Sequence, residues 1–401
     1  MTTTQNDVTP TQPDVTAVIE AVRQIVPRLR DNALEAEDRR WLPDENLSLL
    51  EDAGVLRMAT PAYLGGLGFS VADQAAVLAE IARGCVSTSW IASVWTSTAW
   101  MVTLFPEEIQ KEVFTNHSVR ISGGFTPSGV LTPTDGGYVL NGAWKFNSGC
   151  RGAHWNVATS VIERPDGSYE EAIAIVPMSQ FSIADDWNVS AVAGTGSCTS
   201  KAENVFVPEH RVVPGDAEAF EAAFAELPPD WQPSGREYGL YSYIIAQGTA
   251  TLIGAGRGAL DVFLQRLPGR GITYTPWTDQ SQHPLTHIQV ATAEAKISAA
   301  EALMGRVYDT LQRRADAGEL PTLQEKAATR SHSAYAVQLV KEAVDILFNA
   351  SGATAIQRNV HIQRFHRDLQ GLALHGMILL SSSLEVQGRV LLGLDPQTPL
   401  L

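Results

Sequence analysis

The chain has 401 residues, of which 44% are hydrophobic and 18% charged, ordinary values for a globular protein of two or three structural units. A formal net charge of -15 argues against nucleic acid and anionic membranes as partners. The three cysteines stand far apart and in no metal-ligand spacing, so we expect no metal site and a reduced, cytoplasmic setting. No apolar run reaches about 18 residues, so we expect no membrane span.

Residues 15–119 are predicted to form an N-terminal helical domain, after a Thr/Pro/Gln-rich tail over residues 1–14 that we expect to be disordered. Apolar residues recur there at helical spacing, beginning with Val18, Val22, Ile25 and Leu29. The glycine-rich stretch 64–68 lacks the Lys-Ser/Thr ending of a phosphate loop and follows no strand, so we interpret it as a turn. Helices are expected over 71–82 and 87–104, the second of which is apolar nearly all round and therefore buried.

Residues 120–214 change to a period of two, which is typical of strands. The strand candidates are Ile121–Phe125, Tyr138–Asn147, Trp155–Ile162, Ala172–Val176 and Val205–Val207. The predicted turns are Gly136-Gly137, Asn141-Gly142 and Pro165–Gly167. Short strands with turns between them predict a central antiparallel β-barrel or sandwich.

The stretch 138–151 (YVLNGAWKFNSGCR) has the strongest local pattern in this domain. Its Asn-Gly dipeptide between two β-prone runs predicts a hairpin turn. After the turn, a side-chain period of two would place Trp144, Phe146 and Ser148 on one side of the strand. An aromatic surface ending in a hydroxyl suits a planar ring with a polar edge, although the aromatic stripe of an ordinary β core has the same pattern.

Residues 215–235 contain several prolines and are expected to form a linker, and helical spacing then returns over 236–401. Four long helices are predicted, around 245–263, 288–303, 337–347 and 375–392. Long amphipathic helices with short connections predict a C-terminal four-helix bundle. The fold class is therefore a multidomain α+β protein.

Four motifs together resemble the acyl-CoA dehydrogenase superfamily, whose fold has the same order of helices, β unit and helices. Phe105–Glu108 closes the buried helix as in that family, and Thr132–Ser148 is similar to its flavin-contacting strand. Gly194–Ser197 and Val205–Arg211 resemble its next β segment, and Arg367-Asp368 matches its helix junction.

Dehydrogenases of this superfamily need a carboxylate base to remove a proton beside a thioester. Neither stretch that could hold that base, Leu369–Gly376 or Tyr241–Leu260, contains Asp or Glu, and His375 stands near the first position. The substitution resembles the two-component flavin-dependent monooxygenase branch, typified by hydroxyphenylacetate, hydroxysteroid and dibenzothiophene monooxygenases. That branch implies an oxygenase that uses reduced FMN or FAD and O2, through a C4a-hydroperoxyflavin, to hydroxylate or epoxidise a small phenol- or indole-like substrate.

The resemblance also implies roles for individual residues. Ser148 stands where the family has a hydroxyl at flavin N5, expected to donate a hydrogen bond there, and Phe146 where an aromatic ring packs on the flavin. His375 would be the general acid/base, since an imidazole titrates near neutral pH. His366, beside the Arg-Asp junction, is interpreted as structural.

Further cofactor and substrate contacts follow from the same resemblance. Gly196 and Ser197 are expected near the flavin, with an ordinary β-turn as the alternative. Arg270 stands where the family has an arginine that binds the flavin phosphate of a neighbouring subunit, with a surface arginine as the alternative.

The substrate residues are the least constrained by the sequence. Trp90, Trp95 and Trp100 are candidates for an aromatic substrate site, with core packing as the alternative, and Thr98 is a further candidate substrate residue. Many hydroxylases of the branch have a histidine at the position aligned with Thr98, so the substrate pocket is expected to differ here.

The family implies a homotetramer, a small aromatic substrate and a separate NAD(P)H-dependent reductase that supplies the flavin. Three alternatives stay open: a flavin desaturase of the acyl-CoA dehydrogenase type, an N-oxygenase of an amine, and a non-catalytic protein with the flavin fold. The sequence leaves the substrate, the site of oxygenation, the choice of FMN or FAD, the reductase and the exact oligomer undetermined.

Overall fold

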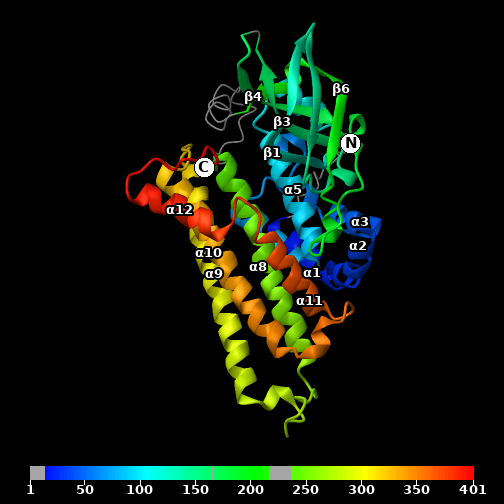
Figure 1. The fold of residues 1–401 in the computed structure, drawn as a ribbon, viewed down its shortest axis with the longest axis vertical. Helices are drawn as coiled ribbons and strands as arrows, with labels where there is room; N and C mark the ends of the chain where they lie inside the picture. The colour runs from blue at the N-terminus through cyan, green and yellow to red at the C-terminus, as the bar shows by residue number, and fades with distance from the viewer. Residues whose placement is uncertain (1–13, 165, 216–235) are drawn as a thin grey trace, which may run out of the picture.

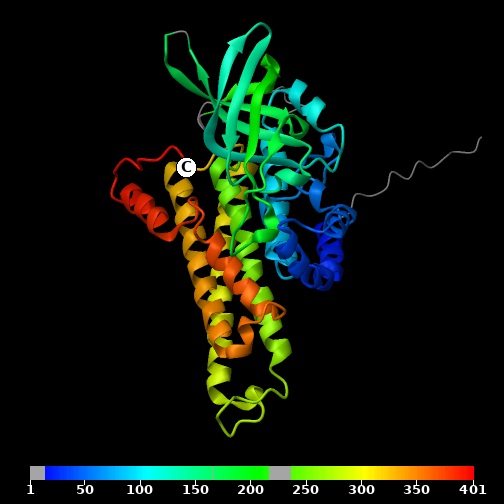
Figure 2. The same ribbon diagram turned by 45° about the vertical axis from the view of Figure 1, so that its right-hand side comes forward.

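The structure, a computed structural model, describes residues 14–164, 166–215 and 236–401. The predicted disordered tail and the predicted linker lie outside the described residues, apart from Asp14 and Gly215 at their ends. Figure 1 shows a β-sheet above a long helical bundle, with the N-terminal helices packed beside both, and Figure 2 shows the same layers from another side.

The N-terminal part is helical, as the apolar spacing predicts. Its helices are α1 (Val15–Asp31), α2 (Ala33–Arg39), α3 (Asp44–Asp52), α4 (Val71–Ala82), α5 (Val86–Val102) and α6 (Glu107–Val113). Asp14 and Ser70 cap α1 and α4 by accepting backbone N–H groups with their side chains. The glycine-rich stretch 64–68 is a turn, as expected, since the 3-10 helix Ala62–Leu64 ends within it.

The central unit is a seven-stranded mixed sheet in the order β5-β6-β2-β1-β3-β4-β7. The strands are β1 (Ile121–Thr134), β2 (Gly137–Trp144), β3 (Trp155–Glu163), β4 (Tyr169–Pro177), β5 (Ser182–Ile183), β6 (Ser200–Pro208) and β7 (Val212–Pro214). The expectation of an antiparallel barrel is wrong in one respect: β1 and β3 pair in parallel, because the chain crosses from one to the other through β2 and the following turn.

The predicted hairpin turn at Asn141-Gly142 is also wrong, because β2 runs straight through it. The β1–β2 turn lies at Asp135-Gly136 instead, and Gly136 has φ 76°, which favours glycine. Asn141 lies at a bulge against β6, where its side chain accepts the backbone N–H of Asn204 at 2.8 Å.

The C-terminal part is built on three long helices and two short ones. They are α8 (Leu240–Arg266), α9 (Pro284–Asp316), α10 (Leu323–Ala350), α11 (His361–Leu372) and α12 (Leu380–Leu391). The predicted fourth helix from His375 is therefore wrong in its start, because His375 lies in the turn between α11 and α12. No helix within the described ranges is long and apolar enough to cross a membrane.

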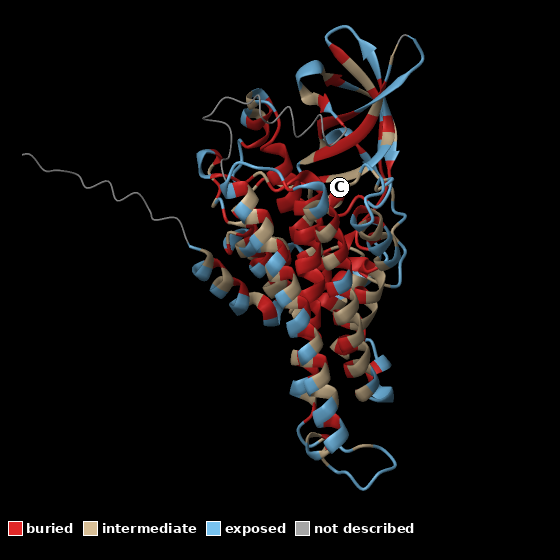
Figure 3. Cartoon of the chain, turned by 90° about the vertical axis from the view of Figure 1, so that its left-hand side faces the viewer, coloured by how far each residue is buried: buried red, intermediate tan, exposed pale blue. Residues whose placement is uncertain are grey.

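The core is thickest where α8 passes between the N-terminal helices and the other bundle helices, as the burial colours in Figure 3 show. α8 approaches α4 closely at Gly254: a Cβ added there would lie 2.1 Å from the carbonyl oxygen of Ala79. A backbone atom cannot move aside as a flexible side chain can, so this glycine sets the distance between the two helices.

We expect Gly254→Ala to lower the free energy of unfolding by about 1–3 kcal/mol, since overpacking forces the helices apart. Gly305→Ala on α9 is the matched control, because a Cβ there meets nothing within 4 Å. The control should stabilise the helix by about 0.5–1 kcal/mol. Thermal unfolding of both variants measures this, and equal shifts of the same sign would contradict the packing argument.

Candidate active site

Three segments distant in sequence meet at the indole of Trp90. Trp90, on α5, donates its Nε1–H to the hydroxyl of Ser148 at 3.1 Å. Its ring also meets the imidazole of His375 edge-on, with 5.7 Å between ring centroids. The predicted hydroxyl and the predicted imidazole therefore contact the same indole ring, that of Trp90.

The turn after β2 places Ser148 in the interior and Phe146 outside. The expectation that Trp144, Phe146 and Ser148 share one side of a strand is wrong, because β2 ends at Trp144 and Phe146 adopts a left-handed backbone with φ 56°. Buried Asn147 holds this turn by donating its amide to Asn156 and Ser200 at 2.8 and 2.9 Å. Trp144 packs inside the sheet, whereas Phe146 is 73% exposed and meets Trp187 edge-on.

A chain of buried hydroxyls leads from Ser148 into the protein. The oxygens of Ser148 and Ser197 lie 2.8 Å apart, and those of Ser197 and Thr195 lie 2.7 Å apart. Thr195 in turn donates to the carbonyl oxygen of Val192 at 2.8 Å. Ser148, Ser197 and Thr195 are all less than one-tenth exposed, so water does not compete for these contacts.

The segment carrying Thr195 and Ser197 is fixed by Asp368 on α11. The Asp368 carboxylate accepts the backbone N–H of Val192 at 2.6 Å, and Val192 has a left-handed backbone with φ 47° that a β-branched residue rarely adopts. Burial raises the pKa of Asp368 to about 6, although the Val192 N–H and the guanidinium of Arg367 act in the opposite direction.

Arginines of α11 tie the same segment to α2. Arg364 and Arg367 both donate to the carboxylate of Glu37, at 3.2 and 2.9 Å, and Arg367 also donates to the carbonyl of Ser190. Burial opposes the charged form of Glu37, but hydrogen bonds and charge from the two arginines prevail and lower its pKa. The Arg-Asp junction found in the sequence is thus the support of the loop beneath the site.

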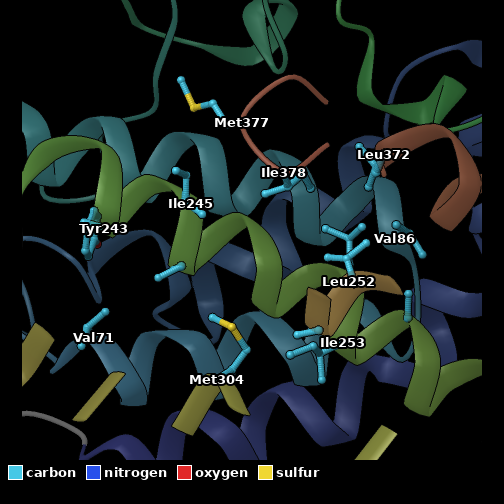
Figure 4. Close-up of a cluster of buried hydrophobic side chains, with 14 of the residues drawn as sticks. Val71, Val86, Tyr243, Ile245, Leu252, Ile253, Met304, Leu372, Met377 and Ile378 are labelled. Carbon is cyan, nitrogen blue, oxygen red and sulfur yellow. The ribbon is translucent and has the colours of Figure 1, made fainter. Parts of the chain in front are cut away.

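His375 is held by the turn between α11 and α12. Met377 and Ile378, directly after it, belong to the buried apolar cluster drawn in Figure 4, together with Ile245 and Leu252 of α8. The backbone N–H of Met377 donates to Nδ1 of His375 at 3.3 Å. A neutral His375 therefore carries its hydrogen on Nε2.

His375 is an exposed residue, but nearby protein atoms desolvate its imidazole. The crowding lowers its pKa below the ordinary value of 6.5, because a charged ring would lose hydration there. His375 is accordingly neutral at pH 7.

Two of the predicted substrate residues, Trp95 and Thr98, make their contacts with residues other than Ser148 and His375. Trp95 is 1% exposed, donates to the carbonyl of Gly149 at 3.3 Å and packs against Trp41, so it supports the turn from behind. Thr98 donates its hydroxyl to Val94 of its own helix at 2.8 Å. The neighbouring hydroxyl of Ser97 is buried and has no partner among the described residues.

Three further candidates have local or distant roles. Gly196 has φ 50° and donates its N–H to Ala193 at 3.2 Å, so it shapes the loop that carries Ser197. Arg270 lies in the connection between α8 and α9, where it donates to Thr354 at 3.1 Å. His366 bonds Asp345 at 2.8 Å and stacks on Phe348, in keeping with a structural part.

The residues that support Ser148 from behind were not predicted from the sequence. Thr195 stands within the Gly194–Ser197 motif, but only the loop geometry brings its hydroxyl to Ser197. The bond between Asp368 and Val192 joins residues 176 positions apart, which no local pattern reveals.

A cavity of about 570 Å³ lies elsewhere, at the C-terminal half of α9. It is lined by Arg306, Asp309, Thr310, Gln312, Arg313 and Asp316. This lining is charged and polar and holds no aromatic or apolar side chain, unlike the mostly apolar lining of a typical small-molecule site. Within the described ranges no cluster of three or more His, Cys, Asp or Glu residues is arranged to hold a metal ion.

Comparison with known proteins gives consistent matches along the chain. Residues 12–120 match the family model of the acyl-CoA dehydrogenase N-terminal domain, and residues 246–379 match that of the acyl-CoA dehydrogenase C-terminal domain. The oxygenase subunit HsaA, a flavin-dependent monooxygenase of Mycobacterium tuberculosis, is 31% identical over 91% of this chain and 92% of its own length. The oxygenase component of p-hydroxyphenylacetate 3-hydroxylase from Acinetobacter baumannii is 29% identical over 96% of this chain and 91% of its own.

A solved structure matches over nearly the same extent. XiaF from Streptomyces sp., in complex with FADH2 and glycerol, superposes with a TM-score of 0.90 at 26% identity. The match covers 96% of this chain and 98% of that one.

Asp368→Asn tests whether the buried carboxylate is as poorly solvated as its surroundings indicate. A folded-state pKa near 6, raised from 3.8, means that the wild type loses up to about 3 kcal/mol of stability as pH rises from about 4 to 6. The variant keeps an acceptor for Val192 but has no such loss. Its melting temperature relative to wild type should therefore be higher at pH 7.5 than at pH 4.5, and the reverse order would contradict this.

Proposed function

This chain belongs to the acyl-CoA dehydrogenase superfamily, and within it to the oxygenase components of flavin-dependent monooxygenases; on that premise we propose its reaction. We propose that it uses reduced flavin and O2 to hydroxylate a small aromatic substrate. The observation that carries the proposal is the Trp90 indole, which contacts both the Ser148 hydroxyl and the His375 imidazole.

The residues of the two stretches that could hold a catalytic base disfavour a desaturase. A desaturase would need a carboxylate in place of His375 or on the facing helix, and neither Leu369–Gly376 nor Tyr241–Leu260 contains Asp or Glu. The shared neighbourhood of Ser148 and His375 also disfavours a non-catalytic protein, since such a protein has no need of a neutral, partly open imidazole beside a buried hydroxyl chain.

The residues at the site fit a flavin. Phe146 offers an uncovered aromatic face, and Ser148 offers an oxygen at the end of a buried polar chain. We propose that Phe146 packs on the ring system and that Ser148 meets its N5 edge. Bound reduced flavin would supply the activation of oxygen, while the protein supplies position, polarity and the exclusion of water.

His375 is proposed to face the reacting substrate. Because Met377 occupies Nδ1, the neutral ring offers an Nε2–H donor to the substrate side. This favours a role in hydrogen-bonding or protonating oxygen over the removal of a proton from a phenol, which needs a free ring nitrogen.

The substrate class is proposed from the relatives and from the aromatic surroundings. The hydroxyphenylacetate enzyme supports a phenol, and an indole-3-acetate monooxygenase of Acinetobacter baumannii, 26% identical, supports a nitrogen heterocycle as the second choice. An N-oxygenase of an amine is retained only as an alternative, because nothing in the described site is an anion placed to bind an ammonium group.

The partner and the assembly are proposed on family grounds. The word component in the relatives' names supports a separate reductase that supplies reduced FMN or FAD. From Gly248, which faces Trp90, α8 runs about 27 Å to its end at Arg266, so Arg270 does not reach a flavin held by Ser148 of its own chain. We propose that Arg270 binds a flavin phosphate of a neighbouring subunit in a homotetramer.

The reaction is tested with the purified protein, chemically reduced FMN or FAD, O2 and a panel of phenols and indoles. We expect hydroxylated product from at least one aromatic compound and little hydrogen peroxide in its presence. Peroxide as the sole product with every compound, or flavin-dependent desaturation of an acyl-CoA, would refute the proposal.

His375→Ala should lower the hydroxylation rate by about 10²–10⁴-fold, the usual contribution of an acid/base group. His366→Gln is the matched control, because His366 bonds Asp345 away from Trp90. The measurement is product formed per reduced flavin under identical oxygen. A loss of equal size in both variants would show that neither histidine has a special role.

The pH profile supplies a separate check on His375. Because crowding lowers its pKa below the ordinary value of 6.5, the ring is more than half neutral at pH 6.5 and above. Any change in the hydroxylation rate that follows protonation of His375 should therefore have its midpoint below pH 6.5. A midpoint above 6.5 that His375→Ala abolishes would contradict the lowered pKa.

A further inference from the structure

Thr195 does not touch Trp90 or His375, yet it sets the direction of the hydroxyl chain that ends at Ser148. Each hydroxyl in this chain has one hydrogen to give and two lone pairs to receive. The donor and the acceptor are fixed at the two ends of this chain of hydrogen bonds, because the Trp90 N–H can only donate and the Val192 carbonyl can only accept.

The donor and acceptor of every hydrogen bond in the chain follow from the bond to Val192. Two oxygens 2.8 Å apart need a hydrogen between them, so the Thr195 hydrogen points to Val192. Ser197 must then give its hydrogen to Thr195 across 2.7 Å. Ser148 must in turn give its own hydrogen to Ser197 across 2.8 Å.

The consequence is that Ser148 has no hydrogen left for a ligand. One of its lone pairs receives the Trp90 N–H, and the other is free. Ser148 would therefore face the site as an acceptor, the opposite of the donor role that the family resemblance implies.

We propose that Thr195 is a positioning residue that makes the site select reduced over oxidised flavin, an inference that rests on the proposed function. Reduced flavin carries a hydrogen on N5 and oxidised flavin carries a lone pair there. An acceptor at Ser148 bonds the first and opposes the second. The oxygenase thus binds the form that the reductase delivers and releases the spent form.

Thr195→Val reverses the chain with little change of shape. Without the Thr195 oxygen, the Ser197 hydrogen is free to point to Ser148, and the Ser148 hydrogen is then directed at the ligand. Thr195→Ser keeps the hydroxyl and is the conservative control. Thr195 is 1% exposed, so both variants leave the surface of the site unchanged.

The experiment measures dissociation constants of wild type and both variants for reduced and for oxidised FMN and FAD, the reduced forms under anaerobic conditions. We expect Thr195→Val to lower the preference for reduced flavin by at least about tenfold, the effect of exchanging a favourable for an unfavourable hydrogen bond. Thr195→Ser should keep the wild-type preference.

An unchanged preference in a folded Thr195→Val protein would overturn the inference and leave the proposed function standing. A wild type that binds neither form of either flavin would overturn the proposed function as well. Where Thr195→Val does not fold, Ser197→Ala serves instead, because it removes the acceptor of the Ser148 hydrogen and should produce the same loss of preference.

Discussion

The contact between the Trp90 indole and the Ser148 hydroxyl is the interaction on which the rest of the site depends. Trp90 is carried by α5, a helix buried nearly all round, so its position is determined by the core and not by a loop. The same ring contacts His375, so Trp90 of the N-terminal helices contacts both the β unit, at Ser148, and the turn after α11, at His375. A small movement of α5 would change the spacing of both groups at once.

Charged side chains hold the loop that carries Val192, Thr195 and Ser197, next to Ser148. Asp368 accepts the N–H of Val192 at 2.6 Å, while Glu37 draws Arg364 and Arg367 against the same segment. Buried charges of this kind contribute little net stability, but removing one partner is costly. Their role here is to fix positions: they hold Val192 in its left-handed backbone conformation and thereby place the hydroxyls of Thr195 and Ser197.

The sequence predicted the order of helices, sheet and helices, because apolar spacing changes with element type and these elements are long. α4 matches the predicted range 71–82, and the buried α5 follows from its continuous apolar run. The Asn141-Gly142 turn was mispredicted because sheet pairing with β6 overrode a local turn preference. The start of the last helix was mispredicted because residues 373–379 keep an apolar pattern while forming a turn.

For the site, the sequence supplied the residue types but not their mutual arrangement. Ser148 and His375 were identified through a family resemblance, and Trp90 only as one of three tryptophans on a helix. Trp95 has the same residue type on the same helix, yet it packs behind the turn against Trp41. Such distinctions depend on long-range packing, as does the direction of the hydroxyl chain.

Isotopic labelling of the oxygen gas tests the central claim most directly. The purified protein is mixed with reduced flavin and a phenol or indole that it accepts as substrate, and it reacts with oxygen-18 gas in ordinary water. The mass of the product is then measured by mass spectrometry. The account predicts one heavy oxygen atom in each product molecule. A product oxygen that comes from water, or a product oxidised without gaining oxygen, would contradict it.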